Sequence, residues 1–260
     1  MDLLEALAVL GAGLGAGVVI TAVGAGSLVS FPILLATGLS PLVANVCNNV
    51  GLVPGGLSGT WGYRRELAGK RRLGWAVAAT SALGALLGAW ILLATPAGAF
   101  EQVVPWLVIL AATLVAVQPL VSSGMLRRAR RRGVVPASRD EGLPTALGAV
   151  ATVIGVYGGY FGAGQGVMLV AFLALGLDED LQTVNGLKNV AIVSANLAAT
   201  AVFVVAAQLD WAVIGLLALG SVVGGWLGSH LGRRLPPTVF RVLVVAMGYL
   251  VGLRLLLVGS

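Results

Sequence analysis

The sequence predicts an all-α polytopic membrane protein, with two inverted repeats of five hydrophobic segments each (about 8–10 membrane segments). Three observations lead to this fold class. The chain is 58% hydrophobic and only 10% charged, with a mean hydropathy of +0.99, whereas soluble domains carry about 25% charged residues. Apolar runs of about 20 residues recur along it, which is the length that crosses a bilayer core, and they lack the alternation of a membrane β-barrel. A motif of glycines and amides also occurs twice.

The first transmembrane repeat is predicted to cover residues 1–125. Its first two segments are short and meet at a glycine break, Gly24-Ala25-Gly26. A helix would be interrupted there, because glycine readily adopts backbone conformations that end a helix. The five predicted segments are residues 4–22, 27–37, 43–62, 75–94 and 103–125.

Residues 126–142 are predicted to form a basic cytoplasmic linker, and residues 143–260 the second transmembrane repeat. The second repeat follows the same plan, again with two short segments separated by a glycine break, Gly162-Ala163-Gly164. Its five segments are residues 143–157, 167–175, 183–207, 211–231 and 239–258.

The duplication is visible at matched positions of the two halves. The Gly-Ala-Gly breaks and the pairs Gly38-Leu39 and Gly176-Leu177 are related by one fixed offset. Two extra residues in the second half then bring its amide motif onto that of the first. The aligned motifs are Asn45-x-x-Asn48-Asn49 with Asn185-x-x-Lys188-Asn189, and Trp75-Ala76-Val77 with Trp211-Ala212-Val213.

The distribution of charge predicts the topology. Five segments are an odd number, so the second repeat must enter the membrane in the opposite orientation. Loops at residues 63–74, 126–141 and 232–238 hold nearly all lysines and arginines, while the loops around Glu101 and Asp210 hold none. By the positive-inside rule, the basic loops are cytoplasmic and both termini lie outside the cytoplasm. We therefore expect a multi-pass protein of the cell (inner) membrane, whose net charge of +6 reflects topology rather than a nucleic-acid partner.

An inverted repeat with broken segments at matching positions is typical of transporters that bind substrate near the membrane midplane. Helix starts after the breaks, at Ser27 and at residues 165–167, are predicted to present free backbone N–H groups that attract anions. The amides share one helical face in each half. The predicted substrate-binding residues are Gly24, Gly26, Ser27, Asn45, Asn48, Asn49, Gly162, Gly164, Gln165, Asn185, Lys188 and Asn189.

Three alternatives remain open for these residues. The glycines can serve only for close helix crossings, and the amides only as hydrogen-bonding contacts between helices. Lys188 can attract an anion, or its long side chain can snorkel toward the cytoplasmic surface. The sequence also leaves open whether the protein forms a homo-oligomer.

The sequence contains no residue set for catalysis, a metal or a cofactor. No aspartate or glutamate lies deep in a segment, and Cys47 is the single cysteine. We therefore predict a non-enzymatic permease for a small anion without a carboxylate proton relay. An anion leaving a negative interior gains about 2.3 kcal/mol per charge per 100 mV, which favours export driven by the membrane potential. An anion-selective channel and a non-transporting membrane scaffold are the alternatives.

At its glycine breaks and amide motifs, the chain resembles the sulfite exporter TauE/SafE family of membrane permeases. The resemblance covers nearly the whole chain outside the central linker. It implies transport of sulfur-containing anions such as sulfite, thiosulfate or organosulfonates. The residues that carry it are Gly24-Ala25-Gly26-Ser27, Pro32, Gly38-Leu39, Ala44-Asn45, Gly158-Gly159-Tyr160-Phe161-Gly162-Ala163-Gly164, Gly176-Leu177 and Asn185-Gly186-Leu187-Lys188-Asn189.

Overall fold

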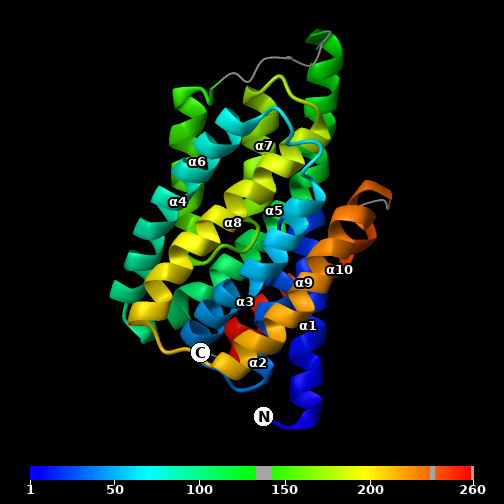
Figure 1. Ribbon diagram of the computed structural model, residues 1–260. Coiled ribbons are helices and arrows are strands. Elements are labelled where there is room, and N and C mark those ends of the chain that lie inside the picture. The colour runs from blue at the N-terminus through cyan, green and yellow to red at the C-terminus, as the bar shows by residue number, and fades with distance from the viewer. Residues whose placement is uncertain (133–141, 235–237, 259–260) are drawn as a thin grey trace.

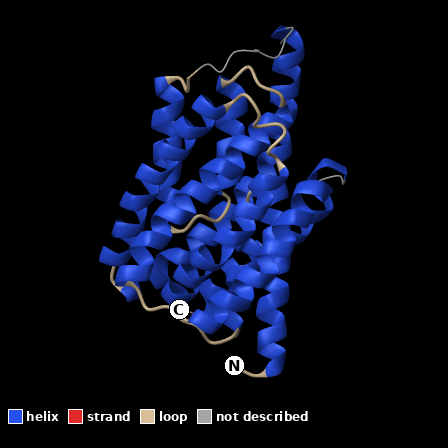
Figure 2. Cartoon of the chain, in the orientation of Figure 1, coloured by secondary structure: helices blue, strands red, loops and turns tan. Residues whose placement is uncertain are grey.

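The computed structural model describes residues 1–132, 142–234 and 238–258. Within these ranges the chain forms ten helices joined by loops, and no strand (Figures 1 and 2). The all-α prediction is therefore confirmed. The helices are α1 (Leu3–Ala22), α2 (Ser27–Ala36), α3 (Pro41–Gly62), α4 (Arg71–Ala94), α5 (Ala97–Arg132), α6 (Thr145–Tyr160), α7 (Gln165–Gly176), α8 (Leu181–Ala206), α9 (Trp211–Arg234) and α10 (Thr238–Val258).

Five helical stretches in the described residues are long and apolar enough to cross a membrane. They are Leu3–Ala22, Arg71–Ala94, Ala97–Pro119, Leu181–Ala206 and Trp211–Gly232. Helices α2, α6 and α7 are shorter, with 10, 16 and 12 residues. The prediction of two short segments in each half holds for these three helices and is wrong for α1, which has 20 residues. Its four internal glycines do not interrupt it, and the backbone leaves the helical path only near Gly24.

The end of the first half also differs from the predicted boundary. Helix α5 begins six residues earlier than expected and continues to Arg132, so residues 126–132 of the predicted linker are helical. The part of that linker at residues 133–141 lies outside the described residues.

The two halves of the chain interlock. Helices α1 and α3 of the first half pack along α9 of the second, while α6 and α8 of the second half pack along α4 of the first. Helix α3 also contacts α8, and α5 contacts α10. The pattern is the same seen from either half. If α1, α3, α4 and α5 are exchanged for α6, α8, α9 and α10, respectively, each of these contacts corresponds to another contact of the same set or to itself.

Glycines make the closest of these helix contacts. A Cβ atom added at Gly84 or Gly88 of α4 would lie 2.0 Å from a backbone oxygen of α6. At Gly220 and Gly224, the matching positions of α9, it would lie 2.1 Å from a backbone oxygen of α1. Side chains are excluded at these four positions, so the backbones approach as small residues allow in membrane helices.

The basic and the cation-free connections lie at opposite ends of the bundle. In Figure 1 the loop between α3 and α4 and the C-terminal ends of α5 and α9 lie toward the top. The N-terminus, the red end of α10 and the α4–α5 and α8–α9 connections lie at the bottom. At the top, Lys70 Nζ lies 2.6 Å from Glu179 Oε1, which ties the α3–α4 loop to the α7–α8 loop.

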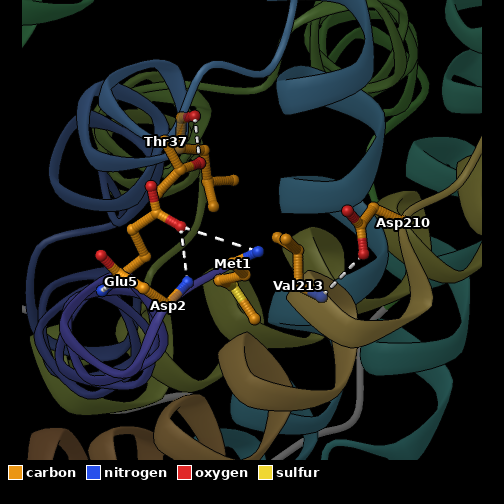
Figure 3. A network of polar contacts seen from close by, with 7 residues as sticks. Met1, Asp2, Glu5, Thr37, Asp210 and Val213 are labelled. Atoms are coloured by element: carbon orange, nitrogen blue, oxygen red, sulfur yellow. Dashed lines mark hydrogen bonds and ion pairs between the residues drawn. The ribbon is translucent and has the colours of Figure 1, made fainter.

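Acidic residues at the lower end cap helices (Figure 3). Asp2 Oδ1 accepts the Glu5 N–H at 2.7 Å, and Glu5 Oε2 accepts the Asp2 N–H at 2.9 Å, which forms a capping box at the start of α1. Asp210 Oδ1 accepts the Ala212 and Val213 N–H groups at 3.0 and 3.1 Å. A carboxylate at a helix N-terminus compensates donors that lack a partner inside the helix. These three acids thus stabilise helix ends at the bundle surface.

Candidate functional site

The glycine breaks of the two halves touch in the middle of the protein. The Gly166 N–H donates to the Gly24 carbonyl oxygen at 3.1 Å. A Cβ at Gly24 would lie 2.6 Å from the Gly166 Cα, so only glycine fits this contact. Gly24 and Gly164 have φ angles of +92° and +77°, in the left-handed region that favours glycine. The sequence therefore supplies glycine both where the chain turns and where the two turns meet.

A small polar cavity lies at this contact. Its volume is about 10 Å³, enough for about one water molecule. Five residues with polar side chains contribute to the wall, and they come from both halves of the chain. The wall consists of Ile20, Gly24, Gly26, Ser27, Asn48, Asn49, Phe161, Gly162, Gln165, Ile192 and Asn196.

The two helix starts at the breaks differ in their free donors. At α7, the N–H groups of Gln165, Gly166 and Val167 donate to the carbonyls of Gly162, Gly24 and Gly164, respectively. The expectation that these three groups are free is wrong for this conformation, because the turn folds back on itself and Gly24 accepts the middle donor. At α2, the Ser27 N–H has no partner among the described residues. The α2 start therefore keeps a donor at the cavity that the α7 start lacks.

Two predicted amides line the cavity and also connect helices. Asn48 Nδ2 donates to Ser27 Oγ at 3.0 Å, and its Oδ1 accepts the Ser30 hydroxyl. Asn49 Nδ2 donates to Asn196 Oδ1 at 3.4 Å, which joins α3 to α8. The Thr200 hydroxyl donates to Asn49 Oδ1 at 3.3 Å. These amides therefore join neighbouring helices, and each Nδ2 uses one of its two N–H groups in the bonds described.

Five predicted residues do not line the cavity. Asn45 Nδ2 donates to the Tyr160 carbonyl at 3.0 Å, at the end of α6. A Cβ at Gly164 would face Ala111 of α5 at 3.4 Å. Asn189 is buried, and its Nδ2 has no hydrogen-bond partner in the described part of the chain. Asn185 is half-buried one turn before Asn189 on α8. The fifth is Lys188.

Lys188 is fully buried and does not reach the membrane surface. Its Nζ donates to the Thr21 carbonyl at 2.7 Å and to the Ile20 carbonyl at 3.4 Å. These carbonyls belong to the last turn of α1, where backbone oxygens lack helical donors and carry partial negative charge. Snorkelling is therefore wrong for this residue. Its ammonium group caps α1 just before the Gly24 break.

Four residues of the wall are absent from the predicted set: Ile20, Phe161, Ile192 and Asn196. Asn196 continues the amide face of α8 two turns beyond Asn189, so periodicity could have included it. Phe161 directly precedes Gly162, and its ring packs edge-on against Phe31 at 5.5 Å between centroids. No sequence signal distinguishes Ile20 and Ile192 from the many other buried aliphatic residues.

Comparisons with known proteins agree with a membrane-transporter fold. A family model described as sulfite exporter TauE/SafE matches residues 9–255. A "Probable membrane transporter protein" of Haemophilus influenzae is 26% identical over 230 residues, covering 87% of this chain and 85% of the relative. The "Probable membrane transporter protein YfcA" of Escherichia coli is 26% identical over 243 residues, covering 93% of this chain and 86% of the relative. No solved structure gives a significant match.

The helical architecture and the apolar spans are those of a multi-pass membrane protein, and the family model and the named relatives assign it to the class of membrane transporters rather than enzymes. Because the family model covers almost the full length, the chain belongs to the sulfite exporter TauE/SafE family.

Proposed function

We propose that this protein is a permease that exports small sulfur-containing anions, such as sulfite, thiosulfate or organosulfonates, by alternating access. In this proposal residues 1–125 and 143–260 are inverted repeats, and the substrate binds between their glycine breaks. The family description supports the substrate class. The polar cavity, whose wall comes from both halves of the chain, supports this position of the site.

The contact between the two breaks is the observation that carries the proposal. In transporters built from inverted repeats, discontinuous helices meet near the midplane, and a relative movement of the two parts exposes the site to either side. The Gly166–Gly24 hydrogen bond brings the broken segments of the two repeats together in this way. A cavity of about 10 Å³ is too small for a sulfur oxyanion, so this conformation corresponds to a closed state that opens for binding.

The wall suits a small anion because the described residues that form it offer neutral donors and no carboxylate. Ser27, Asn48, Asn49, Gln165 and Asn196 provide hydroxyl and amide groups, which can replace part of an anion's hydration shell. The Ser27 N–H adds a backbone donor at the start of α2. Lys188 contributes a positive charge behind the wall, and a charge acts more strongly in a medium of low dielectric constant than in water.

The orientation completes the proposal. With the basic loops in the cytoplasm and both termini outside, export of one negative charge gains about 2.3 kcal/mol per 100 mV of inside-negative potential. No coupling ion is needed for that direction.

The decisive experiment is efflux of labelled sulfite from proteoliposomes with a potassium diffusion potential. We expect saturable efflux that accelerates with an inside-negative potential and persists without proton or sodium gradients. Asn49→Leu and Gln165→Leu should weaken substrate affinity, whereas Gln102→Leu, an exposed amide on α5, should not. An absolute requirement for either gradient would refute potential-driven export. Absence of flux for sulfite, thiosulfate and sulfonates would refute the substrate class. Counterflow of unlabelled sulfite separates a carrier from a channel.

A further inference from the structure

A second polar pocket lies at the basic end of the bundle, between α3 and α9. Its volume is about 280 Å³, and it is lined by Trp61, Gly62, Arg64, Arg65, Trp226 and His230. Along α3, Trp61 is 12 residues from Asn49, or about 18 Å at 1.5 Å per residue. The pocket is therefore separate from the cavity at the glycine breaks. We propose that it binds the phosphate group of an anionic phospholipid in the leaflet on the basic side.

Cationic and donor groups surround this pocket. The Arg64 guanidinium lies 5.2 Å from the centre of the Trp61 ring and donates to the Trp61 carbonyl at 3.1 Å, so its position is held from two sides. Arg65 is exposed beside it. His230 Nδ1 lies 2.8 Å from the Trp226 carbonyl, which leaves the second ring nitrogen for a ligand. Guanidinium groups match the geometry of phosphate oxygens. None of the described residues that line the pocket carries a carboxylate.

The surroundings favour a lipid over a free phosphate ion. The side chains of Trp61 and Trp226 are 68% and 54% exposed, and exposed tryptophans of membrane proteins gather at the level of the headgroups. One helical turn further into the bundle, Leu57 and Val222 are exposed apolar residues on the same two helices. They offer a surface for an acyl chain directly below the charged pocket.

The matching place at the other end of the bundle lacks the cations. By the spacing of the duplicated motifs, Trp90 corresponds to Trp226, while Val204 and Val205 stand where the first half has Arg64 and Arg65. Both ends thus keep an interfacial tryptophan, and only the basic end adds arginines. Anionic lipids of the cytoplasmic leaflet attract basic pockets between membrane helices, so the charge difference fits a ligand present on that side.

Quenching of tryptophan fluorescence by brominated lipids tests this proposal. The full-length protein in detergent is titrated with dibrominated phosphatidylglycerol or dibrominated phosphatidylcholine. The variants Trp61→Phe and Trp226→Phe identify the signal that comes from the pocket. We expect this signal to be quenched at an at least fivefold lower concentration of the anionic lipid, and Arg65→Gln to reduce the preference about fivefold. Arg71→Gln, an exposed arginine outside the pocket, should preserve it.

Three outcomes would overturn the proposal. Equal quenching by the two lipids would show that the arginines do not select a headgroup. An unchanged preference in Arg65→Gln would place the anionic lipid elsewhere. The third is displacement of the lipid by sodium phosphate, under conditions in which sodium chloride of equal ionic strength displaces none. This result would assign the pocket to free phosphate. These readouts are independent of sulfite flux, so they stand or fall separately from the transport proposal.

Discussion

Replacing Gly166 with alanine tests the contact between the two glycine breaks. The new Cβ would lie 2.5 Å from the Gly24 Cα and 2.9 Å from the Gly24 oxygen. Both atoms belong to the backbone and cannot rotate away. Non-bonded carbon atoms prefer separations of about 3.5–4.0 Å, so the breaks must move apart by about 1 Å and their hydrogen bond must weaken.

The expected loss of stability follows from these two effects. Overpacking of a tight contact costs about 1–3 kcal/mol, and a lost hydrogen bond about 1 kcal/mol. Alanine regains up to about 1 kcal/mol over glycine in a helix, although less at the second residue of α7. The net cost is about 2 kcal/mol. At about 2–4 °C per kcal/mol for a chain of this size, the melting temperature should fall by about 4–8 °C.

Differential scanning fluorimetry of the purified protein measures the melting temperature. The rate of sulfite efflux from proteoliposomes reports on the function of the site. Gly215→Ala is the matched control, because a Cβ there meets nothing within 4 Å on α9. It should leave flux unchanged and melt at the same or a slightly higher temperature. If Gly166→Ala keeps the parent melting temperature and flux, the tight contact between the breaks does not hold the site together.

Three further substitutions separate the roles of the polar residues. Lys188→Met removes the charged donor at the end of α1. Because such hydrogen bonds are worth about 1.5–3 kcal/mol, the melting temperature should fall. A rise would show that the free-energy cost of burying the ammonium group exceeds the stabilisation by its hydrogen bonds. Asn45→Leu breaks a bond to α6 outside the cavity, so stability should drop while sulfite affinity stays; altered affinity would place Asn45 at the site. Asp180→Ala removes the N-cap of α8, a loss of about 1 kcal/mol that should be constant between about pH 5 and 7 and shrink below about pH 4. Burial raises the pKa of Asp180, but hydrogen bonds from Thr183 and Gln182 outweigh this effect and hold the pKa below the usual 3.8. Because the pKa is lowered in the folded state, the cap contributes fully above pH 3.8, and its contribution is lost as the carboxylate is protonated. A difference in melting temperature between the parent and Asp180→Ala that grows on acidification would contradict this assignment.

Local features of the sequence were sufficient to predict the order of the helices. The apolar runs and the glycines at positions 24 and 162 that separate them can be recognised from local sequence alone. Each predicted segment overlaps one helix. The extent of α5 was less accessible, because this helix begins before the predicted segment and continues beyond it. The glycines within α1 serve packing against α9, as the close approach of Gly13 to Leu217 shows.

The partners of the polar residues could not be read from the sequence. Periodicity placed Lys188 on a face with Asn185 and Asn189, but the carbonyls that it caps belong to α1, more than 160 residues earlier. The same holds for the Gly166 N–H, whose acceptor Gly24 becomes available only when the two glycine breaks meet. Residue type predicts that a donor needs an acceptor, whereas the tertiary packing decides which one it finds.

The packing indicates which parts should move during transport. Helices α1 and α3 are joined to α9 along their lengths, and α6 and α8 to α4, with glycine-tight contacts that favour two rigid units. Between the units lie the glycine breaks and the α3–α8 contact, where Asn49 meets Asn196. Hydrogen bonds between membrane helices average about 0.6 kcal/mol. We therefore expect the units to separate at this seam.

Disulfides placed within and between the units test this expectation in a Cys47→Ser background. The Cβ atoms at positions 56 and 193, on α3 and α8, would be 3.9 Å apart, close to the usual disulfide spacing of about 3.8 Å. Oxidation of Gly56→Cys/Val193→Cys should reduce sulfite flux to less than about a tenth, because a covalent bond across the seam resists separation, and reduction should restore it. The control Ala22→Cys/Gly232→Cys joins α1 to α9 within one unit, with a Cβ separation of 3.1 Å that requires a shift of a few tenths of an ångström. Its oxidation should leave flux intact. Full flux with the 56–193 disulfide closed would mean that the substrate crosses without movement at this seam.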